Sequence, residues 1–415
     1  MKRFFISALE HSGDIAGAEL AKSIRRQLLE QGEDAEFFGF GGSAMKDAGV
    51  KILENTVDNA IMGFTAVVAE IPRLLRLMHR TAKFIRTNDF DAVIVIDAPD
   101  FNIRFAKLLQ SLRPRTKLVY FIIPQVWAWR RGRTRQIQKY FDVKLSVFPF
   151  ETRWFRNRYV DAHYIGNPTA RRVKHFLTDF DRETERERFN LPKTLTKNTP
   201  IVAILPGSRR SEIKHLLTVQ IETMNELAKE FPDLTGILAG APDRSLEIYA
   251  PHLQNVKFNL KIAVPNKAKT LVKSGFDENS DSVIINDRKF EIYEATALTV
   301  MHVSDAGFVC SGTATLEAAL LELPTVVGYI SSPINFWIAR MLVQIKTISI
   351  ANLCLEQTVF PEIVQGACTT ETALGHLQNL LTNEYRDFFK EQHEILWNKI
   401  GDQNPFEEGA MAILP

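Results

Sequence analysis

The chain has 415 residues, more than one hydrophobic core usually fills, so we expect two domains. Hydrophobic residues make up 45% of the sequence and charged residues 24%, a composition that excludes a disordered chain. The net charge of +2 gives no global attraction for nucleic acid, and no apolar run reaches the roughly 20 residues that span a bilayer.

Cysteine usage and glycine spacing limit the chemistry. Cys310, Cys354 and Cys368 are odd in number and widely spaced, which is typical of reduced thiols in a cytosolic protein, so we expect no disulfide and no metal. The run FFGFGGSAM over 37–45 lacks the spacing of a dinucleotide fingerprint, so we expect no NAD and no other cofactor. The first apolar run breaks at Glu10, which predicts a strand rather than a signal peptide.

Short apolar runs alternate with helical patterns along the whole chain. They lie at 3–9, 35–41, 91–98, 117–123, 144–150, 201–207, 234–240, 304–312 and 324–330. Alternation of this kind predicts parallel sheets covered by helices, so the fold class is α/β and doubly wound.

The segment 178–200, TDFDRETERERFNLPKTLTKNTP, is rich in charge and poor in core residues, which favours a linker. It predicts one domain over 1–178 and a second that begins at 179. Ligands bind outside the carboxyl ends of the strands in open α/β sheets, so we expect a cleft where two such domains face each other.

The first strand runs into LEHSGD, where Ser12 and Gly13 predict a turn and Asp14 opens a helix. Glu10, Ser12 and Asp14 are therefore expected at the carboxyl edge of the sheet. A lone histidine beside a helix start, His11, is more typical of a hydrogen-bonded structural residue than of a catalyst.

A basic amphipathic pattern follows over 61–86. Its apolar positions include Phe64, Val67, Val68, Ile71, Leu74 and Leu75, and arginines lie among them. Such a face can lie in a membrane interface, although core packing is the usual explanation for an apolar stripe of this kind.

The run DAVIVIDAPDFN places Asp97 and Asp100 at the end of a strong apolar strand. A general base is expected at such a place, with Asn102 close by in the chain. An aspartate that caps the next helix is the alternative.

Between Ile122 and Asp142, Trp127 and Trp129 are followed by Arg130 and further cations. The pattern is compatible with a nucleic-acid clamp, a membrane contact, a pocket wall for an anionic molecule, or a core strand end beside a solvated helix.

In the second half, IVAILPGSRRSEI ends a strand at a tight turn, with Ser208 where a helix N-cap is expected and Glu212 one position beyond capping-box spacing. Free N–H groups there favour an anion, and Arg209 can bind phosphate oxygens. A capped helix with a solvated arginine is the alternative.

The stretch SDAGFVCSGTATLEAAL repeats this arrangement. Ser311, Gly312 and Thr313 precede a helical pattern that carries Glu317. Small residues at a helix start let the backbone approach a diphosphate, and Glu317 can accept from ribose hydroxyls, although simple capping gives the same pattern.

In this order, these stretches resemble the lipid A disaccharide synthase family. The matching segments are EHSGD, GFGGSAM, IMGF, DAPDFN, IIPQVWAWRRGR, VFPFE, YIGNP, LPGSRRSEI, SGTATLEAAL, PTVVGYI, NFWIARMLV and SIANL, which span roughly residues 10–365. The resemblance implies a GT-B architecture of two Rossmann-like domains, with the C-terminal segment 352–415 completing the first domain and 179–351 forming the second.

The resemblance also implies an activity. The family is one of inverting glycosyltransferases that transfer 2,3-diacylglucosamine from UDP-2,3-diacylglucosamine to 2,3-diacylglucosamine 1-phosphate, without a metal. It implies a cytoplasmic enzyme on the inner membrane, and it leaves the assembly state open, a homodimer included.

Site residues follow by motif match. The catalytic candidates are Asp100, which we prefer as the base, Asp97, Glu10 and Asp14. The substrate-binding candidates are Ser12, Gly13, Asn102, Gln125, Trp127, Trp129 and Arg130 in the first half, and Ser208, Arg209, Ser311, Gly312, Thr313 and Glu317 in the second. The apolar face of 61–86 becomes the candidate membrane contact.

The sequence departs from the family pattern in three places. Leu9 stands where glycine is usual, Asn167 stands where histidine is usual, and 258–290 is longer than the pattern, which predicts a surface insertion. The remaining alternatives are a UDP-N-acetylglucosamine 2-epimerase-like enzyme, a nucleic-acid-binding protein that uses the Trp/Arg stretch, and a noncatalytic lipid-binding protein.

Overall fold

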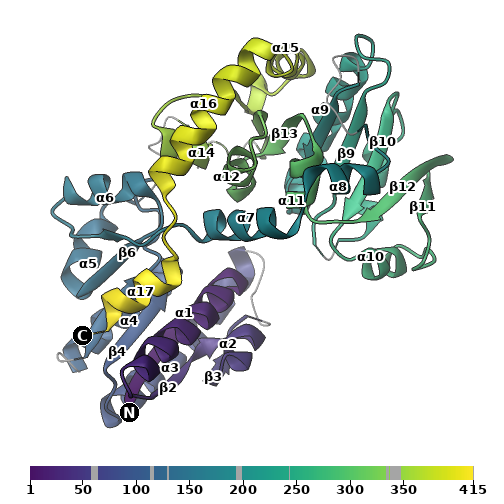
Figure 1. The fold of residues 1–415 in the computed structure, drawn as a ribbon. Helices are drawn as coiled ribbons and strands as arrows, with labels where there is room; N and C mark the ends of the chain where they lie inside the picture. Colours follow the sequence, from purple (N-terminus) through teal and green to yellow (C-terminus); the bar gives the residue numbers. More distant parts are fainter. Residues whose placement is uncertain are drawn as a thin grey trace. The chain divides into compact units, whose positions relative to one another are not determined.

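The computed structural model describes residues 1–57, 64–112, 116–128, 130–192, 199–242, 244–332, 336 and 347–414; for 64–71 and 112 it describes the backbone. The chain forms two compact units (Figure 1). Unit 1 comprises Met1–Pro168 and Asp402–Pro415, and unit 2 comprises Thr169–Gly401.

Unit 1 is built on a seven-stranded sheet in the order β3-β2-β1-β4-β5-β6-β7. Its strands are β1 (Lys2–Ser7), β2 (Ala35–Gly41), β3 (Val50–Asn55), β4 (Ala92–Ile96), β5 (Lys117–Phe121), β6 (Val143–Ser146) and β7 (His163–Tyr164). Every neighbouring pair is parallel. The apolar runs predicted as strands in this half are confirmed, and β3 and β7 are additional.

Helices cover both faces of this sheet, as a doubly wound fold requires. They are α1 (His11–Glu30), α2 (Ser43–Asp47), α3 (Phe64–Thr87), α4 (Pro99–Leu112), α5 (Arg133–Tyr140), α6 (Pro149–Arg156) and α17 (Pro405–Ile413). The side chains of successive residues in β1 point to opposite faces of the sheet. Phe5 packs in the core that α3, α4 and α5 share, whereas Ile6 lies against Gly17 of α1, beside which α17 runs (Figure 1).

Unit 2 contains an eight-stranded sheet in the order β11-β12-β10-β9-β8-β13-β14-β15. The strands are β8 (Ile201–Leu205), β9 (Thr235–Ala239), β10 (Asn259–Val264), β11 (Ser282–Ile285), β12 (Arg288–Glu294), β13 (Ala306–Cys310), β14 (Thr325–Tyr329) and β15 (Glu362–Val364). Only the β11–β12 pair is antiparallel. The four predicted strands of this half, β8, β9, β13 and β14, are confirmed, and β10, β11, β12 and β15 are additional.

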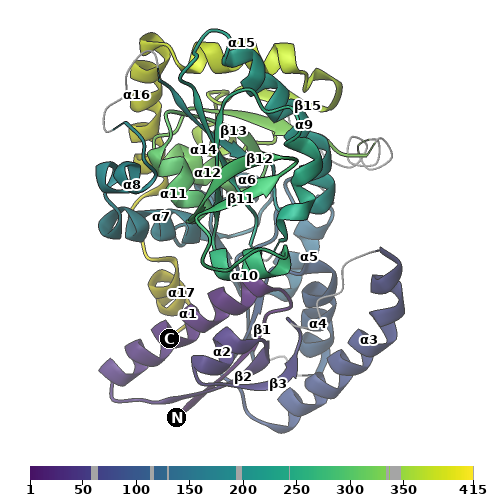
Figure 2. The same ribbon diagram turned by 90° about the vertical axis from the view of Figure 1, so that its right-hand side faces the viewer.

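The helices of unit 2 are α7 (Pro168–Asp179), α8 (Arg182–Arg188), α9 (Arg210–Leu227), α10 (Lys267–Lys273), α11 (Ala297–Val303), α12 (Thr313–Leu320), α14 (Ile350–Leu355), α15 (Thr370–Leu380) and α16 (Asn383–Ile400), with short 3-10 turns η1 (Leu246–Ile248), η2 (Ala250–His252) and η3 (Gln365–Ala367). Helices α9 and α15 pack against each other (Figure 2). Most of the chain after residue 352 therefore belongs to unit 2.

Two predicted boundaries differ from the structure. The first unit ends at Pro168 rather than at Thr178, and only Asp402–Pro415, not all of 352–415, returns to it. Helix α7 is grouped with unit 2, and α14, α15 and α16 pack on other elements of unit 2, which is why these segments belong there.

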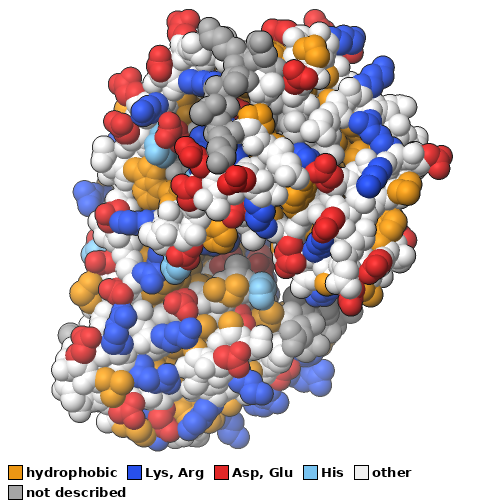
Figure 3. Space-filling view, turned by 45° about the vertical axis from the view of Figure 1, so that its right-hand side comes forward, with side chains coloured by type: hydrophobic (Ala, Val, Ile, Leu, Met, Phe, Trp, Pro, Cys, Tyr) orange, Lys and Arg blue, Asp and Glu red, His pale blue; other side chains and the backbone are white. Residues whose placement is uncertain are grey.

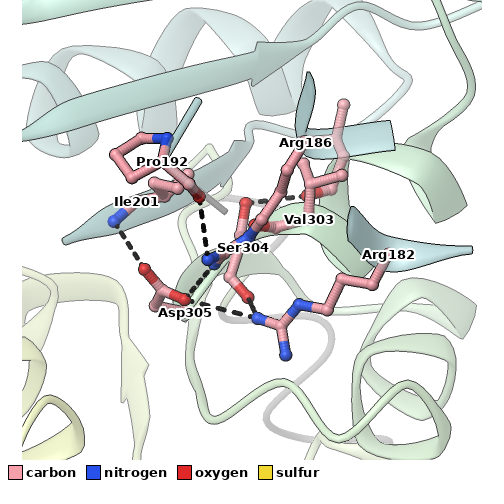
Figure 4. Close-up of polar contacts among 8 residues, drawn as sticks. Arg182, Arg186, Pro192, Ile201, Val303, Ser304 and Asp305 are labelled. Atoms are coloured by element: carbon pink, nitrogen blue, oxygen red, sulfur yellow. Dashed lines mark hydrogen bonds and ion pairs between the residues drawn. The ribbon is translucent and has the colours of Figure 1, made fainter. Parts of the chain in front are cut away.

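The predicted linker is wrong over its described part, because α8 is docked into unit 2. Asp305, which is fully buried, binds the guanidinium groups of Arg182 and Arg186 and accepts from the backbone N–H of Ile201 at 3.0 Å (Figure 4). Arg186 also donates to the carbonyl of Val303 at 2.9 Å. Two arginines of the charge-rich segment are therefore bound to a buried carboxylate, although most of its charged residues are exposed.

The expected surface insertion over 258–290 is also wrong in its first part. It opens with β10, an interior strand whose residues from Leu260 to Val264 are buried. The later part forms the β11–β12 hairpin at the edge of the sheet, with Asn286 and Asp287 at positive φ as a two-residue turn requires.

Candidate active site

The parallel part of each sheet contains one point at which the strand order reverses. In unit 1 this point lies between β1 and β4, and in unit 2 it lies between β8 and β13. The crevice outside the carboxyl ends of the strands at such a point is where doubly wound sheets bind ligands. The sequence motifs EHSGD and DAPDFN follow β1 and β4, and LPGSRR and CSGT follow β8 and β13.

Asp97 follows the last residue of β4 in a left-handed conformation, with φ of 45°, and Ala98 has φ of 40°. Two consecutive non-glycine residues rarely adopt this conformation, because it brings Cβ against the backbone. Desolvation by the surrounding protein, and secondly the carboxylate of Glu10, raise the pKa of Asp97 above its ordinary value of 3.8. The structure thus brings two predicted catalytic candidates, Asp97 and Glu10, into electrostatic contact.

Asp100 lies in a different environment, in the first turn of α4. Its side chain is 67% exposed, and its Oδ1 accepts from Arg130 Nη1 at 2.9 Å and from Arg133 Nη2. Asp100 therefore forms ion pairs with Arg130 and with Arg133 at the start of α5. These pairs join the Trp/Arg stretch to the start of α4.

Asp14, another catalytic candidate, lies in an environment typical of a helix-capping carboxylate. It is 1% exposed, and its carboxylate accepts backbone N–H bonds from Gly42 at 2.7 Å, Ala44 at 3.0 Å and Met45 at 3.1 Å. These N–H groups form the start of α2, where a carboxylate is favourable. A Cβ on Gly41 would stand 2.9 Å from Asp14 Oδ1, so the glycines of GFGG make room for this cap.

Three residues expected to bind substrate are buried instead. Asn102 is fully buried and bonds to protein groups, and Gly13 packs beside Ala8. Trp127 is also buried and donates from Nε1 to Glu151 at 2.7 Å. All three therefore contact protein groups of this unit in the structure.

Two other candidates of this group are exposed: Ser12 in the first turn of α1, and Gln125 in the loop after β5. The structure leaves both available to a ligand. Trp129 lies outside the described residues.

Glu151, which sequence reasoning missed, is the partner that holds Trp127. It is fully buried at the start of α6 and also accepts from the N–H groups of Val147 and Phe148. Burial raises its pKa to about 7, against the lowering effect of these hydrogen bonds. Its place in VFPFE, three residues after Phe148, was the available signal for a capping carboxylate.

The departure at Asn167 has a structural explanation. Asn167 is buried and donates from Nδ2 to the carbonyl of Val147 at 2.8 Å. Gly166 before it has φ of 93°, and a Cβ there would meet the carbonyl oxygen of Gln403 at 2.5 Å. The Gly-Asn-Pro stretch therefore joins the end of unit 1 to its returning C-terminal segment.

In unit 2, the turn after β8 is closed by Glu212. Its Oε2 accepts from the N–H groups of Ser208 and Arg209, both at 3.1 Å, and Oε1 accepts from the Arg209 guanidinium at 2.9 Å. The N-cap is Arg209 and not Ser208, which moves Glu212 into capping-box position. The expectation of free N–H groups at Ser208 and Arg209 is thus wrong, although the Arg209 side chain remains exposed.

The turn after β13 lies beside this one. A Cβ on Gly207, which has φ of 102°, would meet Cys310 Sγ at 3.1 Å. Ser311 is tied down, since its N–H donates to Gly328 and its hydroxyl donates to the carbonyl of Ile348, both at 3.0 Å.

Gly312 and Thr313 offer a different surface at this turn. Both are exposed where α12 begins, and no side chain caps that helix start. Of the described loop, they are the part most accessible to an anion.

Glu317 is buried one turn into α12 and is engaged by Arg172 of α7. Arg172, which sequence reasoning missed, has a pKa lowered by desolvation. A ribose hydroxyl that donates a hydrogen bond to Glu317 would therefore share the Glu317 carboxylate with the Arg172 guanidinium.

Helix α3 divides its apolar residues between core and solvent. Leu74, assigned to the membrane face, is partly buried and packs against the core, while Leu75 is 40% exposed. Arg73 and Arg80 bind Glu54 of β3, both at 3.1 Å. The side chains of Phe64, Val67, Val68 and Ile71 lie outside the described residues.

Charged side chains of both signs lie on the face of the molecule that Figure 3 draws. Among the described helices, none has the length and apolar character needed to cross a bilayer. The described residues also contain no cluster of three or more histidine, cysteine or acidic side chains arranged to hold a metal.

Solved structures share the fold along nearly the whole chain. A UDP-GlcNAc 2-epimerase from Neisseria meningitidis bound to UDP-GlcNAc superposes with a TM-score of 0.55 at 10% identity, covering 99% of this chain and 97% of the other. The S. aureus MnaA–UDP co-structure gives a TM-score of 0.58 at 10% identity, covering 98% and 94%. At this identity the likeness shows the fold alone, which is the GT-B type of two Rossmann-like units.

Sequence relatives are more specific. The lipid-A-disaccharide synthetase family model matches residues 4–277 and 246–403. Lipid-A-disaccharide synthase of Myxococcus xanthus is 34% identical over 369 residues, covering 89% of this chain and 85% of the relative. The Alkalilimnicola ehrlichii synthase is 33% identical over 387 residues, covering 93% and 91%. The chain therefore belongs to the lipid-A-disaccharide synthase family.

Proposed function

We propose that this glycosyltransferase of lipid A disaccharide synthesis moves 2,3-diacylglucosamine from UDP-2,3-diacylglucosamine to 2,3-diacylglucosamine 1-phosphate, with inversion and release of UDP. The match of the family model over 4–277 and 246–403 carries this proposal. The candidates at the reversal point of unit 1 include carboxylates, and those at the reversal point of unit 2 are small residues, a carboxylate and an arginine. Such residues fit a reaction with a sugar acceptor and a nucleotide leaving group.

The proposed base is Asp97 rather than Asp100. Asp97 combines solvent access with a raised pKa, which favours accepting a proton near neutral pH, whereas Asp100 is held by two guanidinium groups. The acceptor 6-hydroxyl oxygen attacks the anomeric carbon, the bond from that carbon to the UDP oxygen breaks, and Asp97 takes the hydroxyl proton.

The leaving diphosphate is assigned to unit 2. The exposed Arg209 guanidinium and the start of α12 at Thr313 supply positive charge and N–H donors to the negative charge that grows on UDP. We infer that Glu317 is a ribose acceptor held in place by Arg172.

The test is UDP release from UDP-2,3-diacylglucosamine, with and without the acceptor lipid. Release should require both lipids, and nuclear magnetic resonance of the product should show a β linkage. Asp97→Asn should lower kcat by about 1,000-fold and leave UDP affinity unchanged, since a base acts in the transition state. The matched variant Asp100→Asn should lower kcat far less; the reverse order of effects would return the base to Asp100.

We also propose that α3 provides a peripheral contact with the cytoplasmic face of the inner membrane. Leu75, Arg76, His79 and Lys83 are exposed at spacings that place them on one side of the helix. An apolar side chain among cations suits an anionic bilayer surface.

Vesicle sedimentation tests this contact. Leu75→Ser combined with Lys83→Glu should weaken binding to anionic vesicles by about 10-fold or more, because an apolar contact and an attractive charge are lost together. Leu29→Ser with Arg26→Glu on α1 is the matched control, since Leu29 is 58% exposed beside basic residues. Equal weakening by both pairs would remove the assignment to α3.

A further inference from the structure

The loop that carries Asp97 is held by a buried polar network. Asn102 Nδ2 donates to the carbonyl of Ile96 at 3.0 Å and to that of Asp97 at 2.8 Å. Tyr120 donates its hydroxyl to the same Asp97 carbonyl at 2.8 Å. Two backbone carbonyls at the end of β4 are thereby fixed by side chains of α4 and β5.

The orientation of the Asn102 amide is itself fixed. Both carbonyls can only accept, so the NH2 group must face them, and Oδ1 is left to accept from the hydroxyl of Ser7 at 3.0 Å. Ser7 ends β1, the strand on the other side of the reversal point. Ser7, Asn102 and Tyr120 are all fully buried, so none of them reaches a substrate.

The network is placed where the backbone is strained. Left-handed conformations at Asp97 and Ala98, with φ of 45° and 40°, are each unfavourable for a residue with a Cβ. Such conformations persist only where surrounding contacts over-determine them. The hydrogen bonds to Ile96 and Asp97 span this turn, and the N–H of Asn102 also donates to the Ala98 carbonyl at 3.0 Å.

We propose that Asn102, oriented by Ser7 and assisted by Tyr120, is a positioning residue that holds the strained Asp97–Ala98 turn and so aims the Asp97 carboxylate. This inference rests on the proposed role of Asp97 as the base. Without the amide, the turn relaxes toward ordinary backbone geometry, and the Asp97 carboxylate moves away from the Glu10 carboxylate.

The decisive experiment is a double-mutant cycle between Asn102→Ala and Asp97→Asn in the full-length enzyme, with UDP release from both lipids as the assay. Alone, Asn102→Ala should lower kcat by about 100-fold, the size expected for a shift of about 1 Å in a reacting group, with UDP affinity unchanged. In the Asp97→Asn background it should cause no further loss.

A second readout is the pH profile of kcat/KM. Desolvation by the surrounding protein and the Glu10 carboxylate raise the pKa of Asp97, so a carboxylate released from its place should titrate closer to 3.8. The acidic limb should therefore move to lower pH in Asn102→Ala. A purely structural role would lower the amount of folded enzyme without moving this limb.

Milder variants keep the test valid if Asn102→Ala folds poorly. Tyr120→Phe removes one hydroxyl and keeps the ring packed on Phe141, with centroids 4.6 Å apart, and should give a smaller loss with the same non-additivity. Asn225→Ala is the control, because that amide also bridges backbone groups, of Asn255 and Lys257, but in unit 2. Its effect should be independent of Asp97.

The outcomes separate the two proposals. If Asn102→Ala or Tyr120→Phe lowers residual turnover by the same factor with and without Asp97, or leaves kcat intact, the positioning role is overturned. If Asp97→Asn alone keeps full turnover, the base assignment fails first, whatever Asn102 does.

Discussion

At the scale of single residues, exposure and partners decide which polar side chains can do chemistry. Asp97 and Asp100 are three positions apart and look alike in the sequence, yet one is raised in pKa beside Glu10 and the other is paired with two arginines. The distinction depends on the left-handed backbone conformation of Asp97 and on Arg130 and Arg133, which follow β5 in the chain.

Glu151 gives a residue-scale prediction of pH dependence. Its pKa is about 7 in the folded protein against an ordinary 4.5, so its protonated form is favoured by folding. Relative to Glu151→Gln, wild-type stability should therefore be highest below pH 4.5 and be lost as the pH rises from there through about 7, by a total on the order of 3 kcal/mol.

Urea unfolding of wild type and Glu151→Gln from pH 5 to 8 measures this difference. Any constant offset from the altered hydrogen bonds of the amide cancels, because only the variation with pH reports the carboxyl group. A difference that is flat across this range would show that Glu151 is ionised throughout.

At the scale of elements, the α1–α2 junction depends on one carboxylate. Asp14→Ala removes the acceptor of three backbone N–H groups at a buried helix start, so the free energy of unfolding should fall by about 2–4 kcal/mol. Urea unfolding measures the loss. Turnover per folded molecule should stay close to wild type, and a large loss there would restore a catalytic role.

Helix α8 offers a matched pair of arginines on one carboxylate. Arg186 has a side chain 3% exposed, and Arg182 one that is 45% exposed. Arg186→Ala should lower the free energy of unfolding by about 3–5 kcal/mol, because it leaves Asp305 buried with a lost partner. Arg182→Ala should lower it by about 1 kcal/mol or less, because solvent screens that contact. Equal losses in urea unfolding would contradict the burial argument.

At the scale of the whole molecule, the chain ends by returning to the unit in which it began. Helix α17 packs beside α1, with Phe406 against Phe121 at a centroid distance of 6.1 Å and Arg26 bound to Glu407 at 2.7 Å. A Cβ on Gly409 would lie 2.6 Å from the Phe121 ring, so this contact is close. The last residues therefore complete the core of unit 1.

Phe406→Ala should destabilise unit 1 selectively. Losing a buried ring should lower its free energy of unfolding by about 3 kcal/mol. Because α17 belongs to unit 1, UDP binding, which we assign to unit 2, should be unchanged. Calorimetry with and without UDP checks both points; an equal loss of UDP affinity would show that α17 also supports the nucleotide loops.

The sequence by itself determined nine of the fifteen described strands, the α/β class, the family and the loops that carry the motifs. These follow from local information: apolar runs form buried strands, and polar or small residues at their carboxyl ends meet at one edge of a parallel sheet. The same locality explains two wrong predictions. The charged run containing Arg186 looked like a linker, and 258–290 looked like an insertion. A local sequence pattern does not show which distant residues or strands such a segment contacts in the folded protein.

Only the tertiary structure decided which polar residues face a ligand and which hold the fold. The hydrogen bonds that fix these roles join residues far apart in the chain. The sequence separation is 95 positions for Asn102 and Ser7, 28 for Asp14 and Gly42, and 119 for Arg186 and Asp305. A polar side chain reads the same in the sequence whether it is solvated or buried with a partner. Its role depends on that partner, because burial is tolerated only where its hydrogen bonds are met.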